Sequence, residues 1–332
     1  MKAFLLKSFG IDGLSLEDVP NPQPGPGQVL VKMRAWSLNY RDLLIVRGIY
    51  APNLKLPFQI LSDGVGEIAA VGAGVTRVRQ GDRVAGIFMQ AWQEGEPSQE
   101  KSASALGAAI PGVAAEYVVF DSEGVVTVPS HLSDEEAATL PCAAVTAWHA
   151  LVTSGHLAAG ETVLVQGTGG VSIFALQFAR LSGARVIATS SSDKKLERVR
   201  ELGASDVINY KTTADWGRKA RELTGRGADH VVEVGGAGTL PQSLEAVRIG
   251  GRVSLIGVLT GGTVNPIPIV MKTITAQGIY VGSRDMFEAM NSAIALAGLR
   301  PVVDRVFAFS ELPQALRYME SGAHFGKIVL KA

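Results

Sequence analysis

A glycine-rich turn is the strongest chemical signal in this sequence. It follows an apolar run, Thr162–Gln166, and precedes a segment with helical periodicity, Gly170–Leu181. Glycine permits a tight turn and lets backbone N–H groups approach a pyrophosphate, which the positive end of the following helix then faces. A glycine pattern alone is weak, but strand, turn and helix occur here in the order that dinucleotide binding requires; the alternative is a turn without a ligand. The expected binding residues are Gly167, Thr168, Gly169, Gly170 and Val171.

The end of the next predicted strand indicates which dinucleotide binds. An NAD site usually places Asp or Glu about 20 residues after the turn, where it binds the ribose hydroxyls. Here the strand Arg185–Thr189 ends in three serines, and the first acid, Asp193, is followed at once by lysines. Hydroxyl groups with a nearby cation suit a 2′-phosphate. We therefore favour NADP(H) over NAD(H), bound by Ser190, Ser191 and Lys194; alternatively, Asp193 only caps the next helix.

Composition excludes several other classes of protein. The 332 residues carry 31 basic and 31 acidic side chains, so no net field attracts nucleic acid or an anionic membrane. The hydrophobic fraction of 47% excludes a disordered chain. The longest uncharged apolar stretch, Val253–Met271, is broken by glycines and prolines and cannot span a bilayer. The single cysteine, Cys142, excludes an internal disulfide framework, and with no recognisable signal peptide we expect a cytoplasmic protein.

Two domains are predicted to position these residues. Short runs separated by proline and glycine turns indicate a compact antiparallel β-barrel over residues 1–125. From a helix start at Ser133 onward, apolar strands alternate with helices, which predicts a parallel, doubly wound sheet. The tail is too short for a domain of its own. We therefore expect residues 283–332 to complete the barrel domain, and residues 126–282 to form the dinucleotide-binding domain.

Seven segments, taken in order, carry a resemblance to a known family. They are Ser37–Leu43, Ser62–Glu67, Gly81–Val84, Ala115–Val118, Leu140–Trp148, the glycine-rich turn and Gly326–Leu330. In this order they resemble the medium-chain dehydrogenase/reductase superfamily over essentially the whole chain, and its zinc-independent, quinone oxidoreductase-like branch in particular. The resemblance implies an α/β protein with a GroES-like β-barrel catalytic domain and a Rossmann doubly wound parallel sheet.

The resemblance also implies that no metal is bound. In zinc alcohol dehydrogenases of this superfamily, a cysteine, a histidine–glutamate pair and a later cysteine hold the catalytic ion. The corresponding residues here are Asn39, Ser62 with Asp63, and Cys142, which do not make the three-ligand open site that zinc catalysis needs. The stretch that matches the structural zinc lobe, residues 90–109, contains no cysteine. We expect no zinc, and we interpret Cys142 as a buried small apolar residue.

Chemistry without a metal favours an activated acceptor. A quinone or an α,β-unsaturated carbonyl accepts hydride and needs only orientation and one proton donor, whereas nothing would stabilise the alkoxide of an alcohol. The resemblance makes Tyr50 the candidate proton donor, although it could instead cap a loop. It implies that Asn39 hydrogen-bonds the nicotinamide ribose or the substrate carbonyl, whereas Asp42 is expected to fix its loop. The segment 90–111, with Trp92, could line the substrate cleft.

The remaining cofactor contacts come from the resemblance alone. Residues implied to contact the cofactor are Thr146 beside the nicotinamide, Tyr210 at the adenosine phosphate, Gly257 and Val258 after the fifth Rossmann strand, and Val281 after the last one. The terminal motif places Lys327 near the nicotinamide, with its side chain expected in solvent.

The sequence leaves two alternative functions open, and it also bears on the oligomeric state. The chain could be an alcohol dehydrogenase, or a nucleotide-binding protein without enzymatic activity. The last predicted strand of the Rossmann sheet, Thr273–Val281, carries no charge, and in this superfamily it pairs with a second subunit. An apolar edge strand needs cover, so we expect a homodimer, or a tetramer. The expected partner is otherwise a small-molecule carbonyl or quinone, with no nucleic acid and no membrane.

Overall fold

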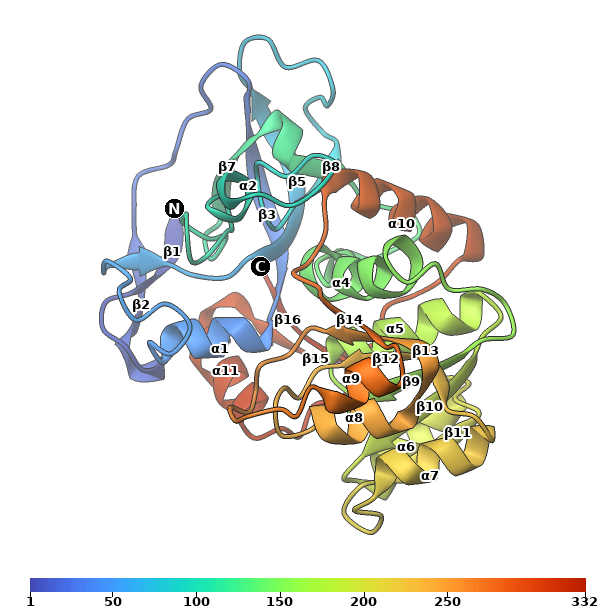
Figure 1. Ribbon diagram of the computed structural model, residues 1–332. Coiled ribbons are helices and arrows are strands. Elements are labelled where there is room, and N and C mark those ends of the chain that lie inside the picture. The colour runs from blue at the N-terminus through green and yellow to red at the C-terminus, as the bar shows by residue number, and fades with distance from the viewer. The chain divides into compact units, whose positions relative to one another are not determined.

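A computed structural model describes residues 1–332 and divides them into two compact units (Figure 1). The first comprises Met1–Val145 and Gly282–Ala332, and the second comprises Thr146–Val281. The boundary expected after residue 125 was therefore placed too early. Helix α3 (Asp134–Ala137) contacts strands of the first unit, which keeps this stretch with the barrel sheet. No helix combines the length and the apolar character needed to cross a membrane.

The first unit is built on a seven-stranded sheet with the order β15-β16-β3-β5-β6-β8, in which β7 also pairs with β3. All of its pairs are antiparallel except β15 with β16. A second, three-stranded sheet has the order β2-β1-β4. The strands are β1 (Lys2–Leu6), β2 (Leu14–Asp18), β3 (Gln28–Ser37), β4 (Phe58–Gln59), β5 (Asp63–Val71), β6 (Arg83–Gly86), β7 (Tyr117–Asp121), β8 (Val125–Thr127), β15 (Val303–Ala308) and β16 (Lys327–Lys331).

Helices flank these sheets. Helix α3 starts where the sequence predicts, because Ser133 and Glu136 form a capping box in which each side chain accepts from the other's backbone N–H. Two helices that the sequence did not reveal, α1 and α11, contact each other. The other helical segments of the unit are η1 (Ile11–Gly13), α1 (Tyr40–Val46), α2 (Gln99–Ser102), η2 (Ser122–Gly124), the π-helical η3 (Leu140–Ala144), α10 (Arg284–Ala297), η5 (Phe309–Glu311) and α11 (Leu312–Glu320).

The C-terminal tail completes the first unit, as predicted. Strand β16 pairs with β3, with Val329 opposite Ser37, and Phe309 stacks on Trp36 at a centroid distance of 4.2 Å. Both rings are buried, so residues from the two ends of the chain share one core.

The second unit is a doubly wound sheet in which every strand pair is parallel. The strand order is β11-β10-β9-β12-β13-β14. Successive strands are added on one side of β9 up to β11 and on its other side from β12 onward. Ligands of such sheets bind at this switch point. Four of its helices, α5, α6, α7 and α8, contact the strands of the sheet. The elements are α4 (Val145–Trp148), the π-helical η4 (His149–Thr153), β9 (Thr162–Gln166), α5 (Gly170–Leu181), β10 (Arg185–Ser190), α6 (Asp193–Glu201), β11 (Asp206–Asn209), α7 (Trp216–Thr224), β12 (Ala228–Glu233), α8 (Leu240–Ala246), β13 (Val247–Leu255), α9 (Ile267–Met271) and β14 (Thr275–Gly278).

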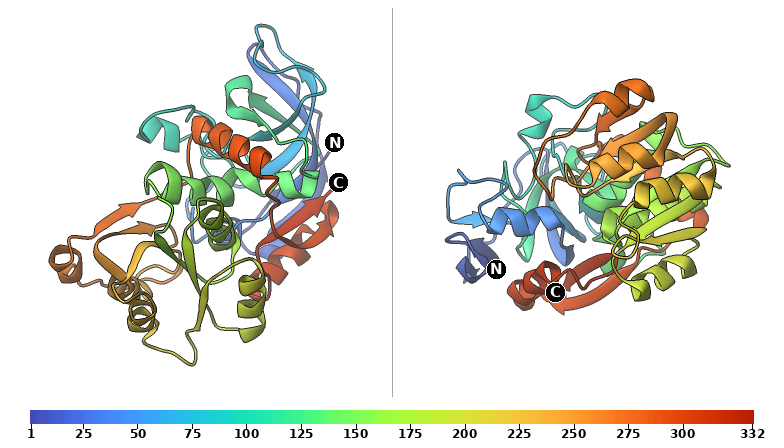
Figure 2. Two further views of the ribbon diagram at one scale, coloured as in Figure 1. Left: turned by 90° about the vertical axis from the view of Figure 1, so that its right-hand side faces the viewer. Right: turned by 60° about the horizontal axis from the view of Figure 1, so that its bottom comes forward.

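The last strand is shorter than predicted. The expected run Thr273–Val281 forms only β14, because Thr273 and Val281 both adopt a positive φ, of 48° and 57°, which interrupts an extended strand. Strand β14 is the edge of the sheet (Figure 2), and all four of its residues are exposed.

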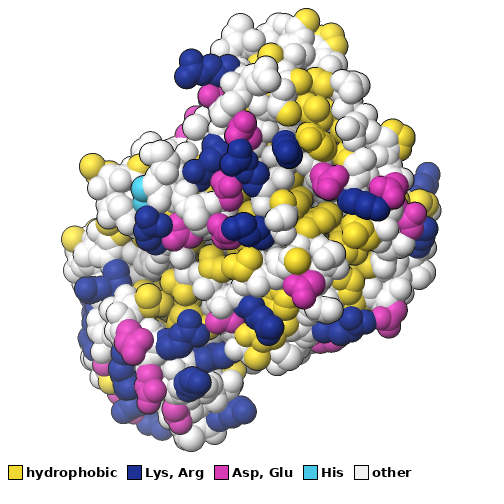
Figure 3. Space-filling view, turned by 180° about the vertical axis from the view of Figure 1, so that it is seen from behind, with side chains coloured by type: hydrophobic (Ala, Val, Ile, Leu, Met, Phe, Trp, Pro, Cys, Tyr) yellow, Lys and Arg dark blue, Asp and Glu magenta, His cyan; other side chains and the backbone are white.

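Charged side chains are mixed on the molecular surface. On the face drawn in Figure 3, Lys and Arg alternate with Asp and Glu rather than forming an area of one sign. This agrees with the formal net charge of zero, so neither the net charge nor this face favours a polyanionic partner.

Candidate active site

Helix α1 positions the first group of candidate residues. Asn39 is its N-cap, with φ −118° and ψ 150°, and the carboxylate of Asp42 accepts the backbone N–H of Asn39 at 2.8 Å. Asp42 is fully buried, and burial raises its pKa to about 6, against the opposing effects of Arg41 and of the bond from Asn39. Its second oxygen, Oδ1, has no hydrogen-bond partner. Asp42 therefore fixes the turn that carries Asn39, as the sequence suggested.

A buried polar network surrounds the side chain of Asn39. The Nζ atom of Lys327 donates to Asn39 Oδ1 at 2.6 Å and to the carbonyl of Leu38 at 2.6 Å. Asn39 Nδ2 donates to Ser62 Oγ at 3.4 Å, and Ser62 Oγ donates to Asp63 Oδ1 at 2.7 Å. The expectation that the Lys327 side chain lies in solvent was wrong: the residue is 3% exposed. Strand pairing of β16 with β3 carries it inward.

Cys142 adjoins this network through its backbone. Its N–H donates to Asp63 Oδ2 at 3.1 Å, from within the π-helical turn η3. The residue is half-buried, so the expectation of a fully buried side chain was only partly correct. Burial of the thiol and the nearby Asp63 carboxylate raise the pKa of Cys142, which keeps the sulfur protonated and neutral.

These donors do not fit a catalytic zinc ion. Zinc in proteins is held by thiolates, imidazoles and carboxylates. Here Asn39 and Ser62 offer neutral oxygens, Asp63 and Cys142 supply one carboxylate and one thiol without an imidazole, and the Lys327 ammonium lies within hydrogen-bond distance of Asn39. No three His, Cys, Asp or Glu side chains come close enough together to hold a metal ion. We derive no chemical step through zinc.

Tyr50 lies in the loop that follows α1, with its side chain partly exposed. The guanidinium of Arg41 lies over the Tyr50 ring, 5.3 Å from the centroid, and over the Phe88 ring at 4.4 Å. Its Nη2 also donates to the carbonyl of Leu106 at 2.7 Å. Cation–π contact and hydrogen bond together tie the Tyr50 loop to the segment around Leu106. Sequence reasoning missed Arg41, because no local pattern reveals its partners.

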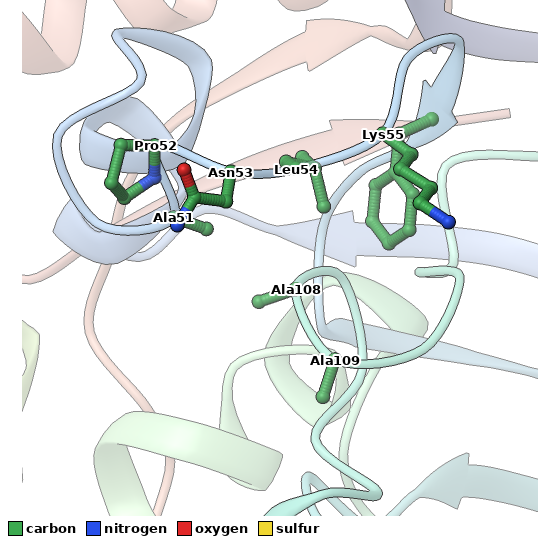
Figure 4. Close-up of a pocket in the computed structure, with 8 residues that line it drawn as sticks. Ala51, Pro52, Asn53, Leu54, Lys55, Ala108 and Ala109 are labelled. Atoms are coloured by element: carbon green, nitrogen blue, oxygen red, sulfur yellow. The ribbon is translucent and has the colours of Figure 1, made fainter.

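The residues that follow Tyr50 line a cavity of about 460 Å³ (Figure 4). The predicted cleft segment contributes to it only in part. Ala108 and Ala109 project toward it, whereas Trp92 is buried in the core with its Nε1 bonded to the carbonyl of Gly95 at 2.8 Å. Its mostly small and apolar lining suits an apolar small molecule. The lining residues are Ala51, Pro52, Asn53, Leu54, Lys55, Phe58, Ala108 and Ala109.

In the second unit, the glycine-rich turn has the geometry of a phosphate site. Gly167 adopts φ +68°, and Gly169 is the N-cap of α5. A Cβ added at either glycine would meet no atom within 4 Å, so the space in front of the turn is open. Ser172, where the fingerprint usually has glycine, is buried and donates to the carbonyl of Gln166 at 2.6 Å. The turn therefore fits a dinucleotide, whose pyrophosphate Gly167, Thr168, Gly169, Gly170 and Val171 would hold.

The residues expected to contact the adenosine ribose come together at the ends of β10 and β11. Ser190 lies opposite Asn209, and the N–H of Tyr210 donates to the Ser190 carbonyl at 3.1 Å. Asp193 accepts from Asn209 Nδ2 at 2.7 Å. The N-cap of α6 is Ser192, so Asp193 is not the cap considered above but the first helical residue.

Two lysines follow Asp193, and they differ in exposure. Lys194 is exposed and Lys195 is half-buried. Lys194 follows Ser191 by three residues, and its exposed side chain is accessible to a phosphate group.

The residues expected to contact the cofactor after the last two strands are each constrained by a different structural feature. A Cβ on Gly257 would lie 1.7 Å from the carbonyl oxygen of Val234, so close packing requires glycine there, while Val258 is exposed. Val281 is strained, because a β-branched residue rarely adopts a positive φ. Its carbonyl accepts from His149 Nδ1 at 2.6 Å, which holds this conformation and identifies the protonated ring nitrogen. Thr146 is buried in α4.

Glu233, which sequence reasoning missed, organises the switch point of the sheet. It is fully buried at the end of β12. Its Oε1 accepts from the N–H groups of Gly235 at 2.7 Å and Gly236 at 3.0 Å, and its Oε2 accepts from Gln166 Nε2 at 2.7 Å. The hydroxyls of Thr239 and Ser243 complete its partners. An acid inside an apolar strand was the signal that could have revealed it.

Comparison with known proteins bears on these sites. Residues 25–130 match the family model described as alcohol dehydrogenase GroES-like domain, and residues 170–296 match that of zinc-binding dehydrogenase. A zinc-type alcohol dehydrogenase-like protein of Schizosaccharomyces pombe is 46% identical, over 97% of this chain and 96% of that protein. The chain belongs to the medium-chain dehydrogenase/reductase superfamily. It is therefore an NAD(P)H-dependent oxidoreductase with the GroES-like and Rossmann-like domains that its motifs predicted.

Solved structures of this superfamily have the same fold. A candidate alcohol dehydrogenase from Sinorhizobium meliloti superposes with a TM-score of 0.93 at 43% identity, covering 100% of this chain and 98% of that one. An NAD-dependent alcohol dehydrogenase gives a TM-score of 0.91 at 34% identity, with both chains covered completely (100% and 100%). A mycobacterial protein solved with NADPH gives 0.84 at 28% identity, again over 100% of each chain.

Another superfamily member bears on substrate. The acryloyl-coenzyme A reductase of Metallosphaera sedula is 30% identical, over 99% of this chain and 99% of that enzyme. Alcohol dehydrogenases and an α,β-unsaturated thioester reductase are thus both among the relatives.

Proposed function

We propose that this enzyme reduces quinones or α,β-unsaturated carbonyl compounds with NADPH and uses no zinc. The observation that carries the proposal is the buried contact between Lys327 and Asn39, because a cation and a neutral amide stand where a metal site needs thiolate and imidazole. The acryloyl-coenzyme A reductase among the relatives agrees with an activated acceptor.

The residues of the first unit would orient the acceptor and supply a proton. When bound, the nicotinamide cofactor supplies the hydride. Asn39 would hydrogen-bond the substrate carbonyl or the nicotinamide ribose, and Tyr50, held by Arg41, would donate the proton that completes the reduction. The cavity beside the Tyr50 loop supports an apolar acceptor. An alcohol would instead need a base and a stabilised alkoxide, for which this site offers no thiolate–imidazole ligand set to hold a metal.

NADPH is the proposed cofactor. The glycine turn and α5 would bind the pyrophosphate, and Ser190, Ser191 and Lys194 would bind a 2′-phosphate with help from Tyr210. The first acid after these serines, Asp193, accepts from Asn209, so its carboxylate is less available to bind ribose hydroxyls. Solved relatives with NADPH and with NAD both exist, which makes this preference a point for experiment.

We also propose a homodimer formed through the edge of the Rossmann sheet. Strand β14 leaves one side unpaired and exposed, and the neighbouring helix α9 presents Val270 and Met271 at 72% and 75% exposure. Large exposed apolar side chains beside an open strand edge are features of a surface that a second chain covers.

Stopped-flow oxidation of NADPH and of NADH against quinones, enones, aldehydes and alcohols tests the function, together with metal analysis of the purified protein. We expect rapid oxidation of NADPH by a quinone or enone at substoichiometric zinc. The second candidate, favoured by the alcohol dehydrogenases among the relatives, is alcohol–aldehyde interconversion. Stoichiometric zinc with alcohol oxidation would overturn the proposal in its favour.

A further inference from the structure

Lys327 lies at the first position of β16, the last strand of the chain. Val329 pairs with Ser37 on β3, and the N–H of Leu38 donates to the carbonyl of Ile328 at 3.0 Å. This pairing brings Lys327 beside Asn39, the residue that opens helix α1. The lysine is thus held by two secondary-structure elements, and its ammonium is removed from solvent.

The chemistry of an ammonium fixes the orientation of the Asn39 amide. An ammonium has only donors, so the atom of Asn39 that lies 2.6 Å from Lys327 Nζ must be the amide oxygen. The amide nitrogen then donates to Ser62 Oγ. The single hydroxyl hydrogen of Ser62 is donated to Asp63 Oδ1. Every donor in the series points the same way, from the cation Lys327 to the carboxylate Asp63.

One hydrogen of the amide remains for a ligand. Asn39 Nδ2 carries two hydrogens, and Ser62 accepts one of them, over the long distance of 3.4 Å. Lys327 holds the oxygen of Asn39 on its own side, so the free N–H is the group that the amide offers to a ligand. This N–H pairs with an acceptor, such as a carbonyl or quinone oxygen.

We infer that Lys327 is a positioning residue that holds the Asn39 amide with its N–H₂ group turned to the substrate carbonyl oxygen. Without Lys327 only the long contact with Ser62 orients the amide, and a rotated amide would turn its oxygen toward the carbonyl and repel it. The cation also polarises the amide, which strengthens its N–H as a donor. This rests on the proposed carbonyl reduction and names the atom that recognises the carbonyl.

A double-mutant cycle in kcat/KM tests the inference, with Lys327→Met, Asn39→Ala and the double variant. Because Lys327 acts through Asn39, we expect Lys327→Met to lower kcat/KM at least tenfold, and to have little further effect once Asn39 is alanine. Lys327→Arg, which keeps the charge and the donors, should recover part of the loss. The matched control is Lys331→Met on the same strand, whose exposed ammonium pairs with Glu135 at 2.6 Å; its kcat/KM should change less than twofold.

If Lys327→Met fails to fold, the variant Asn39→Asp provides a second test of the inference. Aspartate keeps an acceptor for Lys327, removes the Nδ2 donor and adds a negative charge beside the Lys327 cation. We expect this variant to keep the near-ultraviolet circular dichroism of the wild type, which reports on folding, while kcat/KM falls at least tenfold. Full activity of Asn39→Asp would overturn the inference. So would losses from Lys327→Met and Asn39→Ala that simply multiply in the double variant.

The carbonyl substrate is whichever one the wild type reduces fastest, an aldehyde included. Failure of the proposed function would appear as a wild type that reduces neither quinone nor enone, whereas failure of this inference would appear as multiplicative losses on a working substrate. The two outcomes are therefore distinguishable.

Discussion

Replacing the buried carboxylate of Asp42 should change how the stability of the protein depends on pH. Burial raises the pKa of Asp42 from its ordinary value of 3.8 to about 6, although Arg41, the Asn39 N–H and Lys327 lower it; the nearby Asp63 raises it further. One pKa unit corresponds to about 1.4 kcal/mol, so the change is on the order of 3 kcal/mol. Asparagine has nearly the same shape, can accept the Asn39 N–H through its oxygen and does not titrate.

The sign follows from which state holds the proton. Between about pH 4 and pH 6 the folded protein keeps a proton on Asp42 that the unfolded chain has released, so the free energy of unfolding falls as pH rises. Asp42→Asn removes this fall. Its stability relative to the wild type should therefore rise with pH, by roughly 1.5 kcal/mol between pH 5 and pH 8, the remainder lying below pH 5.

Urea unfolding at several pH values, followed by tryptophan fluorescence, measures the difference. Trp36 and Trp92 are both fully buried in the first unit and report on its unfolding. As a control, Asp215→Asn replaces an aspartate whose side chain is 68% exposed, and it should change the unfolding free energy by less than about 0.5 kcal/mol at every pH. If the difference between Asp42→Asn and wild type stays constant from pH 5 to pH 8, the burial argument is wrong.

Three further results are expected. Gly169 has an ordinary φ of −78° and open space where a Cβ would lie, so Gly169→Ala should keep the stability of the protein while the Kd for NADPH, titrated by fluorescence, rises at least tenfold. Gly167 has a φ of +68°, so Gly167→Ala should raise this Kd and also lose about 1 kcal/mol of stability. Unchanged affinity in both would remove the turn from the cofactor site. The raised pKa of Cys142 should make native protein react with a disulfide reagent at pH 8 at less than a tenth of the rate in urea, and equal rates would contradict it. Glutamate at both Val270 and Met271 should convert dimer to monomer in analytical ultracentrifugation; a dimer that persists would place the interface elsewhere.

The elements that local sequence determines were predicted closely. The strand Thr162–Gln166 and the helix Gly170–Leu181 have in the structure the bounds read from the sequence. An apolar run, a glycine turn and a helical period are all visible within 20 residues of chain, so nothing distant had to be known. The helix start at Ser133 was found for the same reason, from a capping serine followed by three acidic residues, and the structure adds a capping box there.

Features that depend on distant pairing could not be predicted. Lys327 and Asn39 are 288 residues apart, and only the antiparallel pairing of β16 with β3 buries the lysine. The positive φ at Thr273 and Val281 excludes both residues from the last strand, although both residue types favour strands. For Glu233 the sequence showed an acid in an apolar strand, but not the donors that would satisfy it.

The first unit is built from both ends of the chain, and this affects how the protein folds while the ribosome synthesises it. A ribosome completes all six strands of the Rossmann sheet before it makes the strand that carries Lys327. Until then, the edge of β3 at Ala35–Ser37 lacks its partner and is open to pairing with other chains. We expect the nascent protein to need chaperone protection longest in its N-terminal region, the part that leaves the ribosome first. A tag or truncation at the C-terminus would then act on the catalytic centre and on solubility together.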